Sequence, residues 1–418
     1  MLAKETLTGY ETMQANILIL THWSYKDALI QTYTLPYVAV IRKTLPPACT
    51  ITVITSEQES LALTEAETKA INQEWKARNM KLVAFPYKRF GIKKLVGSGL
   101  ELMKLAQLVK RDKIGVIHAF CTPAGSIGYL LSWLTGAKFV IDSYEPHAEA
   151  MVENHTWSEK GAAYRILHRL EKSQTQRAHS VIATTRGMKQ YAREQFGVDI
   201  HQFYVKPACV DLQKFYPREK DAELQYKLGL AGKIICVYAG KLGGIYLKGE
   251  VFDFIKVCYE HWGDTFRFLM LTNATKEEID AEVARVGLPK EVVLAQFVLH
   301  DEVPRYLSLG DFAINPVKPV PTKRYCTSIK DGEYWAMGLP VVITPDISDD
   351  SSIIQEHKIG YVFKNLDNEE YRKAVLTIND ILLQDKSALQ KRVRSVAEQY
   401  RSFSIAEAIY DSIYKKQV

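Results

Sequence analysis

The sequence lacks the features that mark several classes of protein. Its six cysteines are scattered without a CxxC pair, so it has neither the common zinc-site pattern nor a disulfide framework. No apolar run reaches the ~20 residues of a membrane-spanning helix, because the longest, within 128–141, is interrupted by Ser132, Thr135 and Lys138. The opening MLAKETLTGYETMQA has no apolar core typical of a signal peptide, so we expect a cytoplasmic protein. Internal repeats and low-complexity segments are also missing.

What the chain does have is enough material for two domains. It contains 418 residues, 47% of them hydrophobic and 24% charged, which is typical of globular proteins. Residues 1–217 hold 27 Lys and Arg against 19 Asp and Glu, a net +8, whereas the remainder is at −2. A basic half would favour an anionic surface such as a lipid leaflet or a phosphorylated acceptor. Ordinary solvated surface charge is the alternative, and nothing indicates a nucleic-acid partner.

One basic segment carries a membrane hypothesis. The stretch YKRFGIKKL at 87–95 sets Lys88, Arg89, Lys93 and Lys94 among apolar residues and contains no acidic residue. Lysines there would meet anionic headgroups while the apolar residues enter the interface. This predicts a peripheral contact with the inner face of the membrane. The alternative is a loop whose apolar side chains pack on the domain.

Strand and helix patterns alternate along the chain, which is the signal of parallel sheets built from βαβ units. We expect two Rossmann-like, doubly wound α/β domains, spanning 1–210 and 211–400, and a last helix in 401–418 that packs back on the first domain. The segment KPACVDLQKFYP at 206–217 has a proline near each end. Its apolar residues follow neither the helical nor the strand period, so it is the expected linker. The predicted strands are 16–20, 51–55, 82–85, 116–119, 138–141, 180–184, 233–239, 265–271, 292–297, 312–314, 341–344 and 360–363.

The segment SIKDGEYWAMGLPVVIT at 328–344 predicts a short helix, a Gly-Leu-Pro stop and a buried strand. Ser328 followed by Asp331 has the outline of a capping box. The free amides and the positive dipole end of this helix would then face an anionic ligand. Glu333 lies one turn further on. A helix and strand that merely pack are the alternative.

A glycine-rich loop follows the predicted strand 233–239. It reads GKLGGIYLKG and contains Gly240, Gly243 and Gly244 together with Lys241 and Lys248. Such a turn lets the backbone approach a phosphate closely, and two lysines can neutralise a diphosphate. The order fits neither the Walker template nor GxGxxG. A plain strand-to-helix turn with exposed lysines is the alternative.

Taken together, these motifs resemble a known family. AGKLGG, YLKGE, HDEVPRYLSLGDFAINP, SIKDGEYWAMGLPVVIT and SSIIQEHKIGYVF, in this order, are similar to the C-terminal half of family 4 glycosyltransferases of the GT-B fold, and 206–217 resembles their interdomain segment. The resemblance covers 116–365 well and 1–115 only as a domain pattern. It implies two Rossmann-like domains facing each other across a cleft. It further implies transfer of a sugar from a nucleotide-diphosphate donor, with retention, to a saccharide or lipid-linked acceptor in cell-surface polysaccharide or glycoconjugate synthesis, without a metal or other cofactor.

The resemblance also assigns roles in the second domain. Lys241 and Lys248 would contact the donor diphosphate, and Glu333 would accept hydrogen bonds from the ribose hydroxyls. Positive charge there would stabilise the leaving diphosphate in the transition state more than in the ground state. Lys330 matches the Ser-Pro-x-Lys form of some members. The remaining donor-side positions are Gly240, Gly243, Gly244 and Ser328.

Two departures from the family pattern put the donor sugar in doubt. Tyr325 stands where the family has the first carboxylate of a Glu-x7-Glu pair, which reads the donor sugar. The family's Gly-Gly loop before the next helix is replaced by Ser348, Asp349 and Asp350.

In the first domain, Asp142 falls at the position of a family histidine that touches the donor sugar, and Glu145 and His147 follow it. Acids and a histidine at the carboxyl end of a parallel strand face the crevice where ligands bind. We therefore expect a general base or acceptor contacts here; a solvated helix start is the alternative. The loop 22–31 lacks the glycine pair that many members carry, so it predicts no acceptor contact.

Two further functions remain open. A GT-B nucleotide-sugar 2-epimerase would need its own acid and base residues, whose pattern is not evident. A non-catalytic nucleotide-sugar-binding protein is favoured by Tyr325 and disfavoured by Lys241, Lys248 and Glu333.

Overall fold

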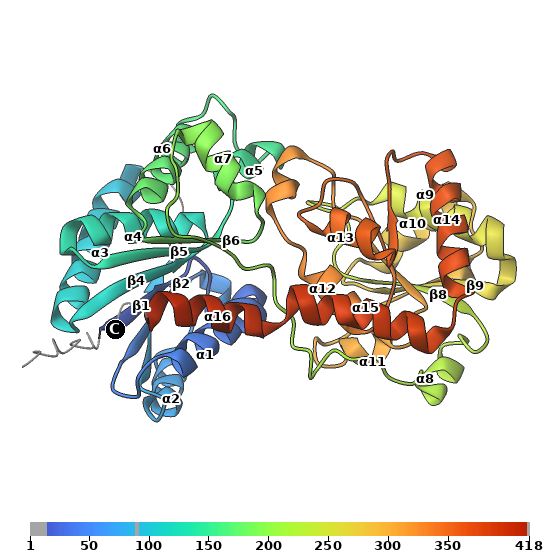
Figure 1. The fold of residues 1–418 in the computed structure, drawn as a ribbon, viewed down its shortest axis with the longest axis horizontal. Coiled ribbons are helices and arrows are strands. Elements are labelled where there is room, and N and C mark those ends of the chain that lie inside the picture. The colour runs from blue at the N-terminus through green and yellow to red at the C-terminus, as the bar shows by residue number, and fades with distance from the viewer. Residues whose placement is uncertain (1–14, 88–91, 416–418) are drawn as a thin grey trace, which may run out of the picture. The chain divides into compact units, whose positions relative to one another are not determined.

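The computed structural model describes residues 15–87 and 92–415, with 92–98 described by their backbone alone. These residues form two compact units (Figure 1). The first unit comprises the chain up to Val152, Trp157–Lys206 and the residues from Ser404 onward. The second comprises Glu153–Thr156 and Pro207–Phe403.

A parallel sheet of seven strands, in the order β3-β2-β1-β4-β5-β6-β7, forms the centre of the first unit. Helices cover a parallel sheet on both faces, which explains why β1 and β6 read as apolar runs and are almost wholly buried. The strands are β1 (Asn16–Leu20), β2 (Ile51–Glu57), β3 (Met80–Pro86), β4 (Ile114–Phe120), β5 (Lys138–Tyr144), β6 (Ser180–Ala183) and β7 (Phe203–Val205). The helices between them are α1 (Leu35–Thr44), α2 (Glu65–Lys76), α3 (Ile92–Arg111), α4 (Thr122–Thr135), α5 (His147–Glu153), α6 (Ala162–Arg177) and α7 (Gly187–Phe196).

The second unit repeats this plan with six parallel strands in the order β10-β9-β8-β11-β12-β13. Its strands are β8 (Ile234–Ala239), β9 (Phe266–Leu271), β10 (Val293–Gln296), β11 (Phe312–Asn315), β12 (Val341–Ile343) and β13 (Gly360–Val362). Its helices are α8 (Ala222–Lys227), α9 (Gly249–Trp262), α10 (Lys276–Val286), α11 (Val303–Leu307), α12 (Ile329–Ala336), α13 (Asp350–His357), α14 (Asn368–Leu382) and α15 (Lys386–Arg401). None of the described helices in either unit is long and apolar enough to cross a membrane.

Both sheets reverse their strand order at one point. In the first sheet the reversal lies between β1 and β4, and in the second it lies between β8 and β11. Ligands of doubly wound sheets bind outside the carboxyl ends of the strands at this reversal. The predicted fold class of two Rossmann-like, doubly wound units is confirmed, and the loops after β8 and β11 are the first places to look for a site.

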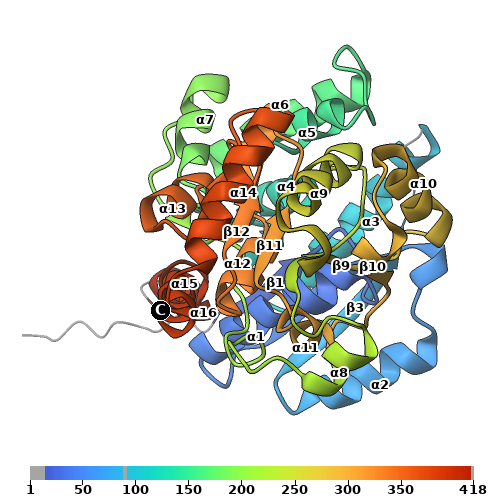
Figure 2. The ribbon, with the colours of Figure 1, turned by 90° about the vertical axis from the view of Figure 1, so that its right-hand side faces the viewer.

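Helices α9 and α14 lie against one another beside the second sheet (Figure 2). The ring of Phe254 on α9 meets that of Tyr371 on α14 edge-on, with centroids 5.8 Å apart. Near the other end of the pair, the indole N–H of Trp262 donates to the side-chain oxygen of Asn379 (3.2 Å). Apolar packing and this hydrogen bond together hold the helix that begins at the glycine-rich loop.

The ends of the two units differ from the boundaries drawn on the sequence. The first unit ends at Lys206, inside the predicted linker, and regains the chain from Ser404 onward. The last helix, α16 (Phe403–Tyr414), packs on α1, with the rings of Tyr410 and Tyr37 6.4 Å apart (Figure 1). Sequence patterns missed β7, which has only three residues, and α15. The start of α15 did carry a signal, because Asp385 caps it by accepting from the amide of Ala388.

Candidate functional site

The glycine-rich loop and the helix after β11 lie on either side of the strand reversal in the second sheet. The loop leaves the carboxyl end of β8 and leads into α9, and α12 follows β11. The backbone N–H of Ala239, the last residue of β8, donates to the hydroxyl of Tyr334 on α12 (2.9 Å). This hydrogen bond fixes α12 against the strand from which the loop starts.

The loop conformation depends on its glycines. Gly243 and Gly244 have φ angles of +74° and +62°, a region that residues with a side chain rarely adopt. Two backbone bonds tie the loop to the chain after β11, since the amide of Leu247 donates to Pro316 O (2.8 Å) and that of Lys318 to Ile245 O (3.0 Å). The backbone is therefore held in place while open space remains beside both glycines.

Three lysines belong to this loop or contact it. Lys241 is exposed and, within the described chain, has no paired acid. Lys248 precedes the first residue of α9, and its Nζ lies 3.9 Å from Glu278 Oε1, beyond hydrogen-bonding distance. Lys330 reaches over from α12, where its Nζ donates to the hydroxyl of Tyr246 (2.7 Å). The positive end of the α9 dipole adds to these charges, so the loop suits an anion such as a diphosphate.

The side chain of Lys330 passes directly over Gly240. A Cβ atom on Gly240 would lie 2.5 Å from Lys330 Cε and 2.9 Å from the Tyr238 hydroxyl. That hydroxyl donates in turn to Lys241 O (2.5 Å). The structure thus brings Gly240, Lys241 and Lys330 together, and it does so because position 240 has no side chain.

The first turn of α12 differs from the predicted capping box. The side chain of Ser328, the residue before the helix, accepts no hydrogen bond from the helix amides. Asp331 does not turn back to Ser328 either: it is fully buried, and its Oδ2 accepts from the amide group of Asn315 (2.8 Å). The prediction is wrong because a buried amide at the end of β11 competes for the same carboxylate. The amides at the start of α12 are left without this cap.

Asp331 on α12 and Asp350 on α13 form a buried pair of acids, and these two helices precede and follow β12. Asp350 on α13 is also buried, and its Oδ1 accepts from the guanidinium of Arg401. Burial and the neighbouring Asp350 raise the pKa of Asp331 well above its usual value. Asp331 Oδ1 and Asp350 Oδ2 have no hydrogen-bond donor in the described chain. A raised pKa favours the protonated acid, which would supply the missing donor at this buried pair.

The loop that replaces the expected glycine pair keeps a glycine-like backbone. Asp346 and Ser348 have φ angles of +55° and +46°. Ser348 is fixed there because its amide donates to Lys323 O (3.0 Å), and its hydroxyl accepts from the amide of Asp350 (3.2 Å). The altered sequence therefore preserves the turn. Tyr325, at the position of the missing carboxylate, ends a short 3₁₀ turn (Pro321–Tyr325) and is half-buried.

Glu333 has the burial expected of a ligand-binding carboxylate. Its side chain is only 10% exposed, and among the described residues no donor comes within hydrogen-bonding distance of it. A carboxylate that is nearly buried without a partner is costly. The group facing it is His300, whose Nε2 lies 3.7 Å from Glu333 Oε1. Sequence reasoning missed His300, although it stands in the motif HDEVPRYLSLGDFAINP.

Asp142, in the first unit, has a different environment from the one its position suggested. It is fully buried, and its Oδ1 lies 3.0 Å from Lys206 Nζ. Its Oδ2 accepts from the hydroxyl of Tyr410 on α16 (2.8 Å) and from His118 Nε2 (3.2 Å). Burial alone raises the pKa of Asp142, but the charge of Lys206 and the hydrogen bonds outweigh it and lower the pKa to about 2. The structure supports a role in holding α16 rather than contact with a ligand.

Glu145 and His147 are separate from this cluster. They lie between β5 and the start of α5, where His147 Nδ1 is 3.2 Å from Glu145 Oε1, and both side chains are partly exposed. The structure therefore pairs these two predicted residues with one another, apart from the buried Asp142. Residues 88–91 of the predicted membrane segment lie outside the described residues, as do the side chains of Lys93 and Lys94.

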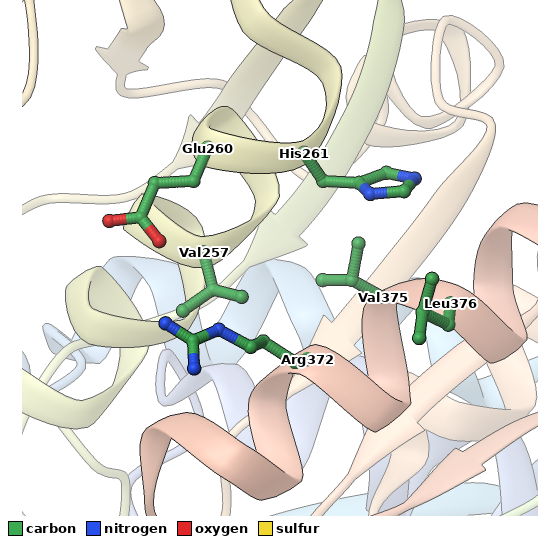
Figure 3. A pocket seen from close by; sticks show the side chains of 6 residues that line it. All are labelled: Val257, Glu260, His261, Arg372, Val375 and Leu376. Carbon is green, nitrogen blue, oxygen red and sulfur yellow. The ribbon is translucent and has the colours of Figure 1, made fainter.

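A shallow pocket of about 230 Å³ lies between α9 and α14 (Figure 3). Glu260 and His261 come from the end of α9, opposite to the glycine-rich loop, and Arg372 comes from α14. The ring of His261 meets that of Trp262 edge-on, with centroids 5.1 Å apart. None of the lining residues belongs to the glycine-rich loop, to α12 or to the segment of His300, so the pocket provides control positions for those residues.

Comparison with known proteins links this arrangement to one family. The model described as "Glycosyl transferase 4-like domain" matches residues 51–208, and the one described as "Glycosyl transferases group 1" matches 234–380. No curated protein sequence matches the chain.

The solved structures with a similar fold include the following three. Anabaena HepE in complex with UDP has a TM-score of 0.70 at 15% identity, covering 96% of this chain and 99% of its own. Sucrose-phosphate synthase from Thermosynechococcus elongatus has a TM-score of 0.68 at 14% identity, covering 96% of this chain and 98% of its own. WaaG, a glycosyltransferase involved in lipopolysaccharide biosynthesis, has a TM-score of 0.67 at 13% identity, covering 95% of this chain and 99% of its own. At these identities the likeness shows the fold alone.

Proposed function

Because the chain belongs to the family 4-like glycosyltransferases of the GT-B fold, we propose that it transfers a sugar from a nucleotide-diphosphate donor to a saccharide or lipid-linked acceptor, with retention of the anomeric configuration. We place the reaction in cell-surface polysaccharide or glycoconjugate synthesis. The observation that carries the donor assignment is the glycine-rich loop with its lysines, together with the nearly buried Glu333, which no donor among the described residues approaches within hydrogen-bonding distance. HepE was solved with UDP, which makes a uridine nucleotide the first donor to test.

The chemistry follows from charge. Breaking the bond between the sugar and the diphosphate leaves negative charge on the leaving group, while the acceptor hydroxyl forms the new bond and gives up its proton. Lys241 and Lys248, with the start of α9, are placed to neutralise that charge as it develops. Lys330 adds a third cation from α12. In this proposal these residues supply the positive charge and no metal or cofactor is required.

Two other functions use the same fold. A nucleotide-sugar 2-epimerase would need acid and base residues near the sugar, and Glu145 with His147 is a partly exposed acid–histidine pair among the predicted residues of the first unit. A non-catalytic binding protein would keep Glu333 and dispense with turnover. Release of nucleoside diphosphate from the sugar nucleotide separates the transferase from the binding protein.

Contact with a membrane surface stays a prediction from the sequence. It is consistent with a lipid-linked acceptor and with the net +8 of residues 1–217. The acceptor itself is proposed only by class.

We expect Glu333→Gln to weaken nucleoside diphosphate binding by about 1–3 kcal/mol, since a charged acceptor for ribose hydroxyls becomes a neutral one. Titration calorimetry with UDP, ADP, GDP and CDP measures this without knowledge of the acceptor. Glu277→Gln, an exposed acid on α10 of the same unit, is the matched control. If the unaltered protein binds none of these nucleotides or their sugar derivatives, the proposed function is lost. If Glu333→Gln binds as tightly as the unaltered protein, Glu333 has only a structural role.

Gly240→Ala and Gly243→Ala form a second test. Alanine at 240 strains the backbone, because Gly240 has a φ of +157°, and it also pushes Lys330 and the Tyr238 hydroxyl away. We therefore expect roughly tenfold weaker nucleotide binding through loss of a charge-assisted contact, beyond the effect of strain alone. Alanine at 243 meets no atom within 4 Å and adds only backbone strain, about 1–2 kcal/mol of stability. Calorimetry and thermal unfolding measure the two effects separately. Equal loss of binding in both variants would show that loop strain, and not Lys330, is responsible.

A further inference from the structure

His300 is held by a short chain of polar contacts on the second unit. It lies between β10 and α11, and its side chain is 47% exposed. Its Nδ1 lies 2.9 Å from the Nζ of Lys214. Lys214 also donates to Asp301 Oδ1 (2.7 Å), and the ring of Phe215 meets the imidazole edge-on with centroids 6.1 Å apart. The ring is therefore fixed from two sides while its Nε2 points to Glu333.

These contacts determine which ring nitrogen carries the proton. A lysine ammonium can only donate hydrogen bonds, so Nδ1 of His300 must accept. The neutral imidazole then carries its hydrogen on Nε2, directed to the carboxylate of Glu333. The 3.7 Å between these atoms is longer than an N–H···O hydrogen bond. The donor on His300 and the acceptor on Glu333 face the same space, each with bonding capacity left.

A hydroxyl group matches this pair because it donates one hydrogen bond and accepts others. Glu333 can take the proton of a hydroxyl but cannot give one to its oxygen, and His300 supplies that donor. We propose that His300 is a specificity-determining residue: its Nε2–H donates to a ribose hydroxyl whose proton is directed to Glu333, so that the site selects ribonucleotides over deoxyribonucleotides. Lys214 is a positioning residue that keeps the required tautomer. The inference rests on the proposed function, because it places the nucleotide ribose at Glu333.

Loss of one hydroxyl affects both residues at once. A deoxynucleotide leaves the nearly buried carboxylate without its donor and the imidazole without its acceptor, and sites built around a substrate hydroxyl discriminate strongly for this reason. Discrimination between ribose and deoxyribose therefore reports on His300 more specifically than affinity does.

The test compares UDP, ADP, GDP and CDP with their 2′-deoxy and 3′-deoxy counterparts by titration calorimetry. For the base that binds, we expect the unaltered protein to prefer the ribonucleotide by roughly 10- to 100-fold over at least one deoxy form. His300→Ala should reduce that ratio about tenfold. Lys214→Met should reduce it less, and should change nothing further in a His300→Ala background. His261→Ala, in the pocket of Figure 3, should leave the ratio unchanged.

Each outcome decides the matter. A smaller ratio in His300→Ala, with unchanged thermal unfolding of the free protein and an unchanged His261→Ala control, supports the proposal. An unchanged ratio in His300→Ala, with nucleotide still bound, overturns this inference alone. An additive effect of Lys214→Met on His300→Ala overturns the positioning role of Lys214. Absence of nucleotide binding to the unaltered protein overturns the proposed function and this inference with it.

Discussion

Replacing Lys248 with alanine is expected to lower kcat by roughly 10²- to 10³-fold, as loss of one preorganised electrostatic contact does in other enzymes. The lysine stands where the glycine-rich loop becomes α9, and its Nζ is 3.9 Å from the nearest acid, Glu278. Its charge is therefore available to an anion. Because the charge on a leaving diphosphate is largest in the transition state, kcat should fall more than nucleotide affinity.

The measurement is release of nucleoside diphosphate from the sugar nucleotide, together with calorimetry of the free nucleotide. Lys256→Ala is the matched control, since Lys256 is exposed on the same helix. Lys248→Arg should recover part of the rate because it keeps the charge. Turnover near that of the unaltered protein in a folded Lys248→Ala variant would remove Lys248 from the reaction.

Asp142→Asn should destabilise the first unit by about 3–5 kcal/mol, the usual consequence of leaving one partner of a buried ion pair uncompensated. The ammonium of Lys206 is fully buried and lies 3.2 Å from the centre of the Tyr37 ring, so water cannot replace the lost carboxylate. The change would also weaken the hold on α16, because Tyr410 donates to the same carboxylate. Hydrogen exchange of the β4 and β5 amides measures this loss within the unit.

The pH dependence has a defined sign. The pKa of Asp142 is lowered to about 2 from a usual value of 3.8. A lowered pKa gives stability that is complete above the unfolded value and is lost as the pH falls through the folded one. The difference between the unaltered protein and Asp142→Asn should therefore persist at neutral pH and shrink toward pH 2.

A double variant separates structure from chemistry. Asp142→Asn with Lys206→Met removes both charges and places a methionine against the aromatic rings, so it should recover much of the lost stability. If Asp142→Asn is as stable as the unaltered protein but loses turnover, the carboxylate takes part in the reaction, as its position in the sequence suggested.

The fold could be predicted from the sequence because buried parallel strands read as unbroken apolar runs. β1 and β8 lie where NILIL and IICVYA stand. The edge strand β7 escaped prediction because three half-buried residues carry no period. Lys206 lies in a segment without helical or strand periodicity, yet the first unit extends to this residue before the chain enters the second unit. Its burial is explained by partners distant in sequence, namely Asp142 on β5 and the ring of Tyr37 on α1.

The conformation of the glycine-rich loop could be predicted from the sequence, because positive φ angles are largely restricted to glycine. Gly243 and Gly244 have the positive φ angles that a phosphate-binding turn would need. Partners that are distant in sequence could not be predicted. The carboxylate of Asp331, for example, accepts a hydrogen bond from Asn315 and does not cap the helix together with Ser328. His300 escaped for the same reason, because its role depends on Lys214 and Glu333, which the fold and not the sequence places beside it.

The return of α16 to the first unit affects the order in which the protein can be completed. The 197 residues of Pro207–Phe403 separate Lys206 from Ser404, and a ribosome synthesises them in roughly 10–40 s. Throughout that time the nascent first unit holds Asp142, Lys206 and His118 without the tyrosines of α16 that complete their cluster. The part of the protein that is synthesised first is therefore finished last. A fragment that ends at the linker would contain an incomplete first unit. A separate peptide of residues 403–415 could supply the missing hydroxyls of Tyr410 and Tyr414.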